Sequence, residues 1–378
     1  MRKGTIVLTG GGTAGHVCPH INLEKELEKH FEKIIYIGSE KGIEKELISS
    51  QTNYAYKSVP TVKFVRKNIF KNILLPFKLS KAIKESKIIL KEVKPSVIFS
   101  KGGYVSLPVV LAASKLKIPI ICHESDISLG LANKLASKHS KLVCTNFKIT
   151  AEKHNKKFIH TGSPLPISNL TKSQAKEVLK IKTTKPILLV TGGSQGAGSI
   201  NKIIFENINE LTKKYYIIHL VGKNNLNKKL INHHDYKQIE FSNQMWTIFK
   251  VADFAISRAG ANSILEILAN KIPTIFIPLP KGISRGDQID NAKYLKQLKV
   301  ASIIFQDELN YKKLQNELIF LEKHANFIKK QIELQNFEDG TKKIIDIILK
   351  TKKDWTIVFQ SFNFNHYCYY FKTLNQSI

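Results

Sequence analysis

The stretch Pro186–Asn201, PILLVTGGSQGAGSIN, decides the fold of this 378-residue chain. Ile187–Val190 is a short apolar run before a glycine cluster, which predicts a buried strand of a parallel sheet. The four glycines that follow let the backbone turn sharply and approach a ligand, and the apolar spacing of Ser199–Leu211 predicts a helix. This order favours phosphate binding, because free N–H groups and the helix dipole attract negative charge. A tight turn without a ligand is the alternative.

The first half of the chain repeats this order. Thr5–Thr9 is an apolar run, Gly10–His16 (GGGTAGH) is a glycine loop, and Val17–Leu27 has helical spacing. Gly162–Pro166, GSPLP, has the composition of a linker between the halves. The sequence therefore predicts two nucleotide-binding-type α/β domains with a ligand in the cleft between them.

Composition limits the classes of partner. Lysine and arginine number 59 against 30 acidic residues, a net charge of +29, which favours a polyanionic partner such as nucleic acid, anionic lipid or a phosphorylated substrate. Lysines scattered over solvated helices would explain much of the same charge. The four cysteines are isolated, so no zinc or redox pair is predicted. With no signal peptide and no membrane-spanning run, a reducing cytoplasm is the expected location.

Polar side chains follow the predicted strands of the first half. His16 follows the first glycine loop, where it is either a chemical group or a helix-start donor. Lys101–Ser106 is a further glycine loop, and the strand Pro119–His123 leads into Glu124, Ser125 and Asp126, with Asn133 on the next helix. Such residues point into the ligand site of an open α/β sheet. Gly10–Gly15 also reads G-x-G-x-x-G with Glu40 after the next strand, so an NAD-dependent oxidoreductase is an alternative.

Val62–Lys78 mixes bulky apolar and basic residues and has no acidic residue. This composition is typical of a contact with a membrane interface. A core helix with a solvated lysine face is the alternative. The residues expected at the membrane are Phe64, Arg66, Lys67, Phe70, Leu74 and Phe77.

Further strands of the first half are expected at Ile34–Gly38, Val93–Ser100 and Leu142–Thr145. In the second half, strands are expected at Ile217–Val221, Ile239–Phe241, Phe254–Ser257 and Pro273–Pro278. Arg258–Glu266, RAGANSILE, is another glycine turn into a helix, on which Glu266 could accept hydrogen bonds from ribose hydroxyls or be an ordinary surface residue. Gln288–Ala292, QIDNA, opens a helix with groups that suit sugar hydroxyls or a helix cap. Phe327–Lys350 is expected to be mostly helical, whereas the aromatic segment Lys353–Ile378 has no period and is assigned no structure.

Six motifs in this order resemble the MurG family of bacterial glycosyltransferases. They are GGTAGH at Gly11–His16, GGYVS at Gly102–Ser106, HES with LANK at His123–Lys134, GGSQGA at Gly192–Ala197, RAGANSILE at Arg258–Glu266 and QIDNA at Gln288–Ala292, within residues 4 to 350. The resemblance implies a GT-B fold, in which two Rossmann-like doubly wound domains face each other across a cleft. It implies domains at 1–163 (acceptor and membrane) and 164–338 (donor), a helix at 339–352 that returns to the first domain, and an atypical tail at 353–378.

The resemblance also implies the activity: inverting transfer of GlcNAc from UDP-GlcNAc to the undecaprenyl-diphosphate-linked muramyl-pentapeptide, lipid I to lipid II, in peptidoglycan synthesis. The expected location is the cytoplasmic face of the bacterial inner membrane, at an anionic surface, with no nucleic acid partner and no cofactor. Candidate catalytic residues are His16, His123 and Glu124, and candidate acceptor residues are Tyr104 and Asn133. Candidate donor residues are Thr13, Ala14, Gly15, Asp126, Gly193, Ser194, Gln195, Gly196, Ser242, Arg258, Ala261, Glu266, Gln288 and Asn291. No D-x-D pair is present, so no metal is predicted.

Three positions depart from the family pattern. Ser125-Asp126 stands where Gln-Asn is usual, Pro166 replaces an arginine near the phosphates, and Asp287 replaces a glutamine or histidine. Lys281 or Arg285 could supply the missing positive charge. A catalytically weakened protein that binds sugar nucleotide and membrane is therefore a further alternative.

Overall fold

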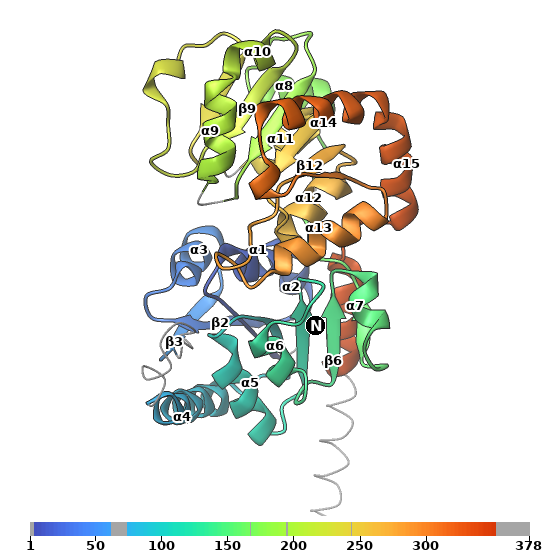
Figure 1. The fold of residues 1–378 in the computed structure, drawn as a ribbon. Helices are drawn as coiled ribbons and strands as arrows, with labels where there is room; N and C mark the ends of the chain where they lie inside the picture. Colours follow the sequence, from blue (N-terminus) through green and yellow to red (C-terminus); the bar gives the residue numbers. More distant parts are fainter. Residues whose placement is uncertain (1–3, 62–73, 167, 194–195, 243, 353–378) are drawn as a thin grey trace, which may run out of the picture. The chain divides into compact units, whose positions relative to one another are not determined.

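The computed structural model describes residues 4–61, 74–166, 168–193, 196–242 and 244–352. The chain forms two units (Figure 1). Unit 1 contains Met1–Glu124, Leu129–Pro164 and the chain from Gly340, and unit 2 contains Ser125–Ser128 and Leu165–Asp339. The expected boundaries at 163/164 and 338/339 each lie one residue from these. The assignment of Ser125–Ser128 to the first domain is corrected, because their contacts are with unit 2.

Unit 1 is built on a seven-stranded parallel sheet of order β3-β2-β1-β4-β5-β6-β7. The strands are β1 Thr5–Gly10, β2 Lys33–Ser39, β3 Ala55–Val59, β4 Val97–Gly102, β5 Ile120–Glu124, β6 Leu142–Thr145 and β7 Phe158–His160. The helices are α1 Ala14–Asn22, α2 Glu24–His30, α3 Ile43–Gln51, α4 Leu75–Val93, α5 Ser106–Lys115, α6 Leu131–Ala136 and α7 Lys148–Glu152.

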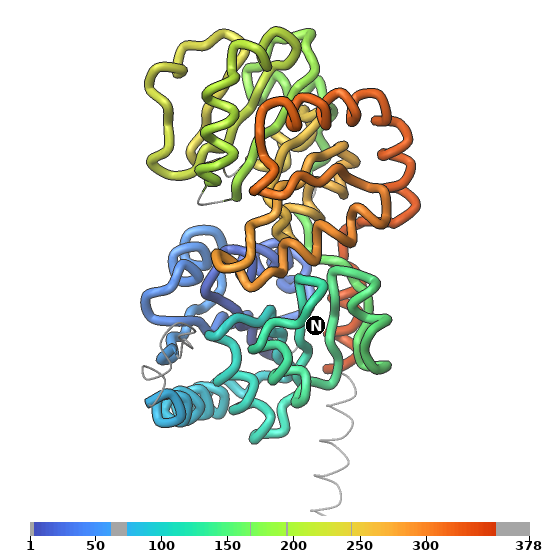
Figure 2. Tube along the Cα trace, in the orientation of Figure 1, coloured from blue at the N-terminus to red at the C-terminus, as the bar shows by residue number. Residues whose placement is uncertain are grey.

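Alternate residues of these strands enter two separate cores, because successive side chains of a strand point to opposite faces. Ile6 and Leu8 of β1 pack with α1, α2 and α3 and with residues 341–352, whereas Val7 packs with α4, α5 and α6. Residues 341–352 are helical, and Ile344 and Ile348 are fully buried in the first core. Figure 2 shows this last red segment running beside unit 1. Both faces of the sheet are therefore covered, as a parallel sheet requires.

Unit 2 has a six-stranded parallel sheet of order β10-β9-β8-β11-β12-β13. The strands are β8 Ile187–Thr191, β9 Tyr216–Leu220, β10 Tyr236–Ile239, β11 Phe254–Ser257, β12 Thr274–Phe276 and β13 Ser302–Ile303. The helices are α8 Lys172–Val178, α9 Gly198–Glu206, α10 Ile208–Thr212, α11 Met245–Val251, α12 Ala261–Ala269, α13 Asp287–Gln297, α14 Tyr311–Lys323 and α15 Ala325–Gln335, with short 3-10 turns at Lys228–Leu230 and Gln306–Glu308.

Several expected elements differ in extent. The helix expected over Val17–Leu27 begins at Ala14 and is interrupted at Leu23, between α1 and α2. The strand expected over Ile239–Phe241 is observed earlier in the chain, as β10. Val93 ends α4 instead of opening a strand, because Lys94 is left-handed (φ 43°) and Pro95 follows. The helix expected over Ser199–Leu211 is interrupted at Asn207, between α9 and α10. The helix expected over Phe327–Lys350 breaks after α15, where Asn336 is left-handed (φ 54°).

Candidate functional site

The first two glycine loops of unit 1 pack against each other through their backbones. Gly12 has a φ of +87°, and a Cβ placed there would lie 2.6 Å from Cε1 of Tyr104. Gly103 has a φ of +82°, and its Cβ would lie 2.2 Å from the carbonyl oxygen of Gly11. Only glycine satisfies both the positive φ and the close approach. The ends of β1 and β4, which are neighbouring strands, therefore form one continuous surface that includes Tyr104.

His16 lies in the first turn of α1, and its imidazole is partly exposed. Its Nδ1 is 3.0 Å from the Oγ1 of Thr13, the residue that precedes the helix. If Nδ1–H donates to this hydroxyl, the proton of the neutral imidazole is on Nδ1. Ala14 and Gly15 open the same helix and are partly exposed. This is the geometry that a general base on the loop requires.

His123, a second catalytic candidate, is fully buried at the end of β5. Its Nε2 is 2.9 Å from the carbonyl oxygen of Gly162, so this nitrogen carries the proton and donates. Its Nδ1 is 2.9 Å from Nζ of Lys101, also fully buried, and accepts from that ammonium group. Burial first, and the charge of Lys101 second, lower the pKa of His123 well below its ordinary value of 6.5. With both nitrogens engaged, the imidazole holds the strand ends together.

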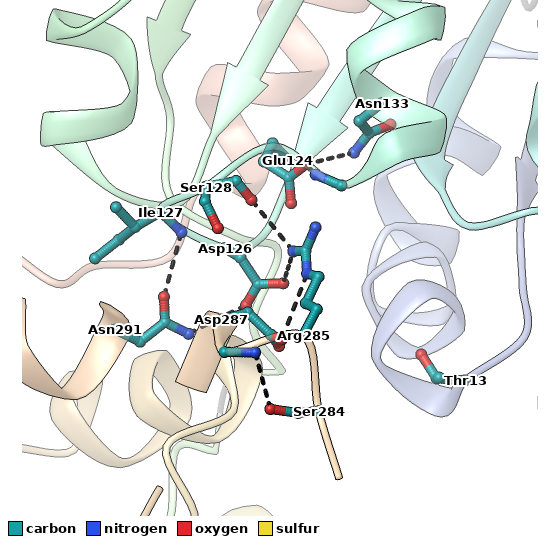
Figure 3. A network of polar contacts seen from close by, with 12 residues as sticks. Thr13, Glu124, Asp126, Ile127, Ser128, Asn133, Ser284, Arg285, Asp287 and Asn291 are labelled. Carbon is teal, nitrogen blue, oxygen red and sulfur yellow. Dashed lines mark hydrogen bonds and ion pairs between the residues drawn. The ribbon is translucent and has the colours of Figure 1, made fainter. Parts of the chain in front are cut away.

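Glu124 and Asn133 form a buried pair, each 4% exposed. One carboxylate oxygen of Glu124 accepts from the Nδ2 of Asn133 at 3.0 Å and from the backbone N–H of Gly130 at 2.9 Å. The same Nδ2 donates to the carbonyl oxygen of His123 at 3.0 Å. Thus α6 is fixed to the end of β5, and the structure brings these acceptor and catalytic candidates together in unit 1 (Figure 3).

A pocket of about 220 Å³ opens in unit 1 at the carboxyl ends of β2 and β3. It is lined by the loop Ser39–Gly42, by Val59–Thr61 and by Tyr104. Glu40, the residue that would bind ribose in a dinucleotide site, is exposed here. However, the buried carboxylate of Glu44 already accepts the N–H of Gly12 at 3.2 Å. A negative charge under the loop opposes a pyrophosphate at the same loop, which argues against the NAD alternative.

The glycine loop of unit 2 turns as tightly as its sequence predicts. Gly193 and Gly196 have φ values of +82° and +74°, and a Cβ on Gly196 would lie 2.1 Å from the carbonyl oxygen of Val221. Helix α9 follows from Ala197, with no side-chain cap and no acidic residue in its first turn. A helix start of this kind, after a glycine loop, suits an anion. Ser194 and Gln195 lie outside the described residues.

Helix α12 begins in the same way, after the neighbouring strand β11. Gly260 precedes it without a side-chain cap, and Ala261 is its first residue. Glu266 lies further along the helix and is half-buried. Desolvation raises the pKa of its carboxyl from the ordinary 4.5 to about 7. Because burial disfavours the ionised carboxylate, a ligand that donates hydrogen bonds to it would stabilise that form.

Arg258, a donor candidate, contacts several residues of unit 2. Its side chain is 7% exposed in the protein interior, and burial lowers its pKa. The guanidinium donates to the carbonyl oxygen of Ile277 at 3.0 Å, to Oγ of Ser199 at 3.0 Å and to Oε1 of Gln306 at 2.7 Å. Ser199 lies in the first turn of α9. The arginine therefore anchors the helix that follows the glycine loop, a role that its sequence motif does not reveal.

Asp126 is the centre of a polar network in unit 2 (Figure 3). Its carboxylate accepts from Arg285 at 2.7 Å and from Nδ2 of Asn291 at 3.1 Å. Arg285 also lies 3.4 Å from the carboxylate of Asp287 and donates to the carbonyl oxygen of Ser128 at 3.2 Å. The two departures from the family pattern, Asp126 and Asp287, thus share one arginine. Arg285 therefore contacts two carboxylates of unit 2.

Three further donor candidates, Asn291 and Gln288 of α13 and Ser242 after β10, also make hydrogen bonds within unit 2. Asn291 is fully buried, and its Oδ1 accepts from the backbone N–H of Ile127 at 3.2 Å. Gln288 is partly exposed, and its Oε1 accepts from the backbone N–H of Leu279 at 3.1 Å. Ser242 is partly exposed after β10 and accepts from Gln244 at 3.0 Å. Among these donor candidates, Gln288 and Ser242 keep surface for a ligand, whereas Asn291 holds the segment Ser125–Ser128.

The Asp126–Arg285 pair gives a testable stability difference. Asp126→Asn keeps a carbonyl oxygen for Asn291 but removes the negative charge that Arg285 contacts. We expect a coupling free energy of about 1 kcal/mol between Asp126→Asn and Arg285→Gln in a double-mutant cycle of chemical unfolding, because the pair is charge-assisted yet partly exposed. Additive effects of the two substitutions would show that the pair contributes nothing to stability.

Within the described residues, no group of three or more His, Cys, Asp or Glu side chains could hold a metal ion. In the same part of the chain, no helix is long and apolar enough to span a bilayer. Of the residues expected at a membrane, Phe64, Arg66, Lys67 and Phe70 lie outside the described residues. Leu74 and Phe77, at the start of α4, are 58% and 75% exposed.

Family comparisons match both units. Residues 6–145 match the glycosyltransferase family 28 N-terminal domain, and residues 187–347 match the glycosyltransferase family 28 C-terminal domain. A Clostridium botulinum UDP-N-acetylglucosamine–N-acetylmuramyl-(pentapeptide) pyrophosphoryl-undecaprenol N-acetylglucosamine transferase is 41% identical over 360 residues, covering 94% of this chain and all of its own. The protein of the same name from Clostridium tetani is 41% identical over 352 residues, covering 92% of this chain and 98% of its own.

Solved structures agree on the fold. The crystal structure of Acinetobacter baumannii MurG has a TM-score of 0.73 at 24% identity and covers 92% of this chain and all of its own. The glycosyltransferase SnogD from Streptomyces nogalater has a TM-score of 0.63 at 12% identity, with 92% and 99% covered. The expected GT-B fold class is confirmed, with one parallel α/β sheet in each unit. With two domain models matched in order and 41% identity over nearly the whole chain, the protein belongs to the MurG family of glycosyltransferases.

Proposed function

We propose that this protein transfers N-acetylglucosamine from UDP-N-acetylglucosamine to an undecaprenyl-diphosphate-linked muramyl-pentapeptide, which converts lipid I to lipid II. The observation that carries the proposal is the 41% identity over 94% of the chain to transferases whose name states this reaction. The two uncapped helix starts in unit 2 support it, since they follow the neighbouring strands β8 and β11. They suit a diphosphate, and Glu266 suits a ribose.

The chemistry is a single displacement. The acceptor hydroxyl attacks the anomeric carbon as the bond to UDP breaks, so the α-linked donor gives a β-linked product. The hydroxyl proton passes to Nε2 of His16, and the diphosphate leaves as a charge that the N–H groups of unit 2 stabilise. The acceptor sugar and peptide would lie against unit 1, near Tyr104 and its pocket.

The experiment is transfer of labelled N-acetylglucosamine from UDP-N-acetylglucosamine to a lipid-diphosphate muramyl acceptor. Product formation supports the transferase. Binding of UDP-N-acetylglucosamine without turnover would instead support the alternative of a catalytically weakened binding protein. That alternative is based on the departures from the family pattern at Pro166, Asp126 and Asp287.

The acceptor's lipid requires a membrane surface, and α4 offers a contact for one. Phe77 and Leu74 are exposed at its start, and Lys78, Lys81, Lys84 and Lys91 are exposed along it. Its first turn has no acidic residue. Exposed bulky residues enter the acyl boundary while lysines meet anionic headgroups. We therefore propose that the protein binds peripherally at the cytoplasmic surface of the membrane.

We expect Leu74→Ser with Phe77→Ser to reduce sedimentation with vesicles of anionic lipid at least severalfold. Binding of the parent protein should weaken with added salt, because the attraction is screened over roughly 10 Å at 0.1 M. Ile319→Ser on α14, where the side chain is 54% exposed in unit 2, is the matched control. Unchanged sedimentation of the double variant would remove α4 from the membrane contact.

A further inference from the structure

The carboxylate of Glu44 lies directly under the first glycine loop. Glu44 is in the first turn of α3 and is fully buried. One of its oxygens accepts the backbone N–H of Gly12 at 3.2 Å. The other accepts the backbone N–H of Ser39 at 3.1 Å and the hydroxyl of the same serine. Three donors from two strand ends thus converge on one buried side chain.

The surrounding glycines leave room for this carboxylate. A Cβ on Gly11 would lie 2.7 Å from Cδ of Glu44, and one on Gly42 would lie 2.3 Å from its Oε1. Tyr104 covers the other side of the loop. A Cβ on Gly12 would lie 2.6 Å from Cε1 of this ring. The backbone at Gly11 and Gly12 is therefore clamped between a carboxylate and an aromatic ring.

Only an acceptor without protons fits the position of Glu44. Gln has the same length, but its NH₂ group would face the backbone N–H of either Gly12 or Ser39. A buried donor that faces a donor loses its bond and remains desolvated. Asp is one methylene shorter and does not reach the loop. This position is thus specific for glutamate, whereas an exposed position on a helix surface would accept other polar residues.

We propose that Glu44 is a positioning residue for transfer: it fixes the loop Gly11–Thr13 and so sets the place of His16, which follows it. The loop leads directly into α1, and the imidazole of His16 contacts Thr13 at 3.0 Å. Small displacements of a catalytic group have large costs, about 100-fold for roughly 1 Å. The inference rests on the proposed transferase function and adds a residue that does not touch either substrate.

The test compares Glu44→Gln with Glu46→Gln. Both residues are in the first turn of α3, but Glu46 is exposed, so the pair is matched for helix-dipole effects. We expect Glu44→Gln to lower kcat about 10- to 100-fold with the dissociation constant for UDP within about twofold of the parent, since Glu266 and the two helix starts proposed to bind the ribose and diphosphate of UDP are in unit 2. Glu46→Gln should keep the parental kcat.

A double-mutant cycle separates positioning from general loss of structure. If Glu44 acts through His16, Glu44→Gln should cost less than about threefold in the His16→Ala background. Full, additive losses would overturn the proposal, and so would a parental kcat for Glu44→Gln. If the parent protein gives no transfer at all, the proposed function fails before this comparison begins.

Gly11→Ala provides a second variant in case Glu44→Gln does not fold. It keeps the carboxylate but introduces a Cβ that displaces the loop from it. The same loss in kcat and the same non-additivity with His16→Ala are expected. A parental kcat for Gly11→Ala, with a folded protein by circular dichroism, would contradict loop positioning.

Discussion

His16→Ala is expected to lower kcat by about 10²- to 10⁴-fold, the range typical of a lost general base. An unperturbed histidine titrates near 6.5, close to neutral pH. His16 is in the first turn of α1, directly after the glycine loop. His123, the competing candidate, has its Nδ1 lone pair bound to Lys101.

The measurement is steady-state transfer together with direct UDP binding. The dissociation constant for UDP should remain near the parental value, because the loss concerns proton transfer. Thr13→Val is the informative companion, since it removes the hydroxyl that orients Nδ1 and keeps the base. Its loss should be smaller. A near-parental kcat for His16→Ala would rule out the base, and loss of UDP binding would make His16 a donor-positioning residue.

Glu266→Ala should have the largest effect on the donor. Loss of hydrogen bonds to a charged group costs about 1.5–3 kcal/mol, roughly 10- to 150-fold in the dissociation constant for UDP. Glu206→Ala, an exposed glutamate on α9, is the control and should bind UDP normally. Isothermal titration measures both. An unchanged dissociation constant for Glu266→Ala would remove this residue from the site.

The same carboxyl predicts a pH dependence of binding. Its pKa in the free protein is about 7, and ribose hydroxyls donate to the ionised form. Below pH 7 the carboxyl is protonated, so binding must release a proton and the dissociation constant should rise toward tenfold per pH unit. Above pH 8 it should level off. Glu266→Gln should bind weakly at every pH with a flat profile, and a flat parental profile would contradict the assignment.

The glycine loops were predictable because a strand, a positive φ and a helix start leave local marks in the sequence. The strands β1, β8 and β11 lie where the sequence predicts. A helix follows each of them as expected, although the helices expected after β1 and β8 are both interrupted. Short strands carry little pattern, and β13, with two residues, was not predicted. Its place in the sheet comes from pairing with β12, a contact that no local signal encodes.

The partners of charged residues were the least predictable part of the site. Arg258 stands in a donor motif, but its guanidinium is directed to Ser199 and Gln306, distant in sequence. Glu44 looks like an ordinary first-turn glutamate, because its burial depends on Gly11 in a loop that is distant in sequence, as well as on Gly38 and Gly42 nearby. Asp126 and Arg285 are 159 residues apart. Charge in the sequence indicates where polar chemistry exists, but only the fold decides which groups neutralise each other.

The placement of Ser125–Ser128 with unit 2 has a consequence for chimeric enzymes. The chain changes unit after Glu124, Ser128, Pro164 and Asp339, so a donor module is not one continuous insert. A graft of residues 165–339 into a relative would leave Arg285 and Asn291 facing a foreign tetrapeptide in place of Asp126 and Ile127. Exchange of sugar-nucleotide specificity between relatives should therefore succeed only when this tetrapeptide travels with the module.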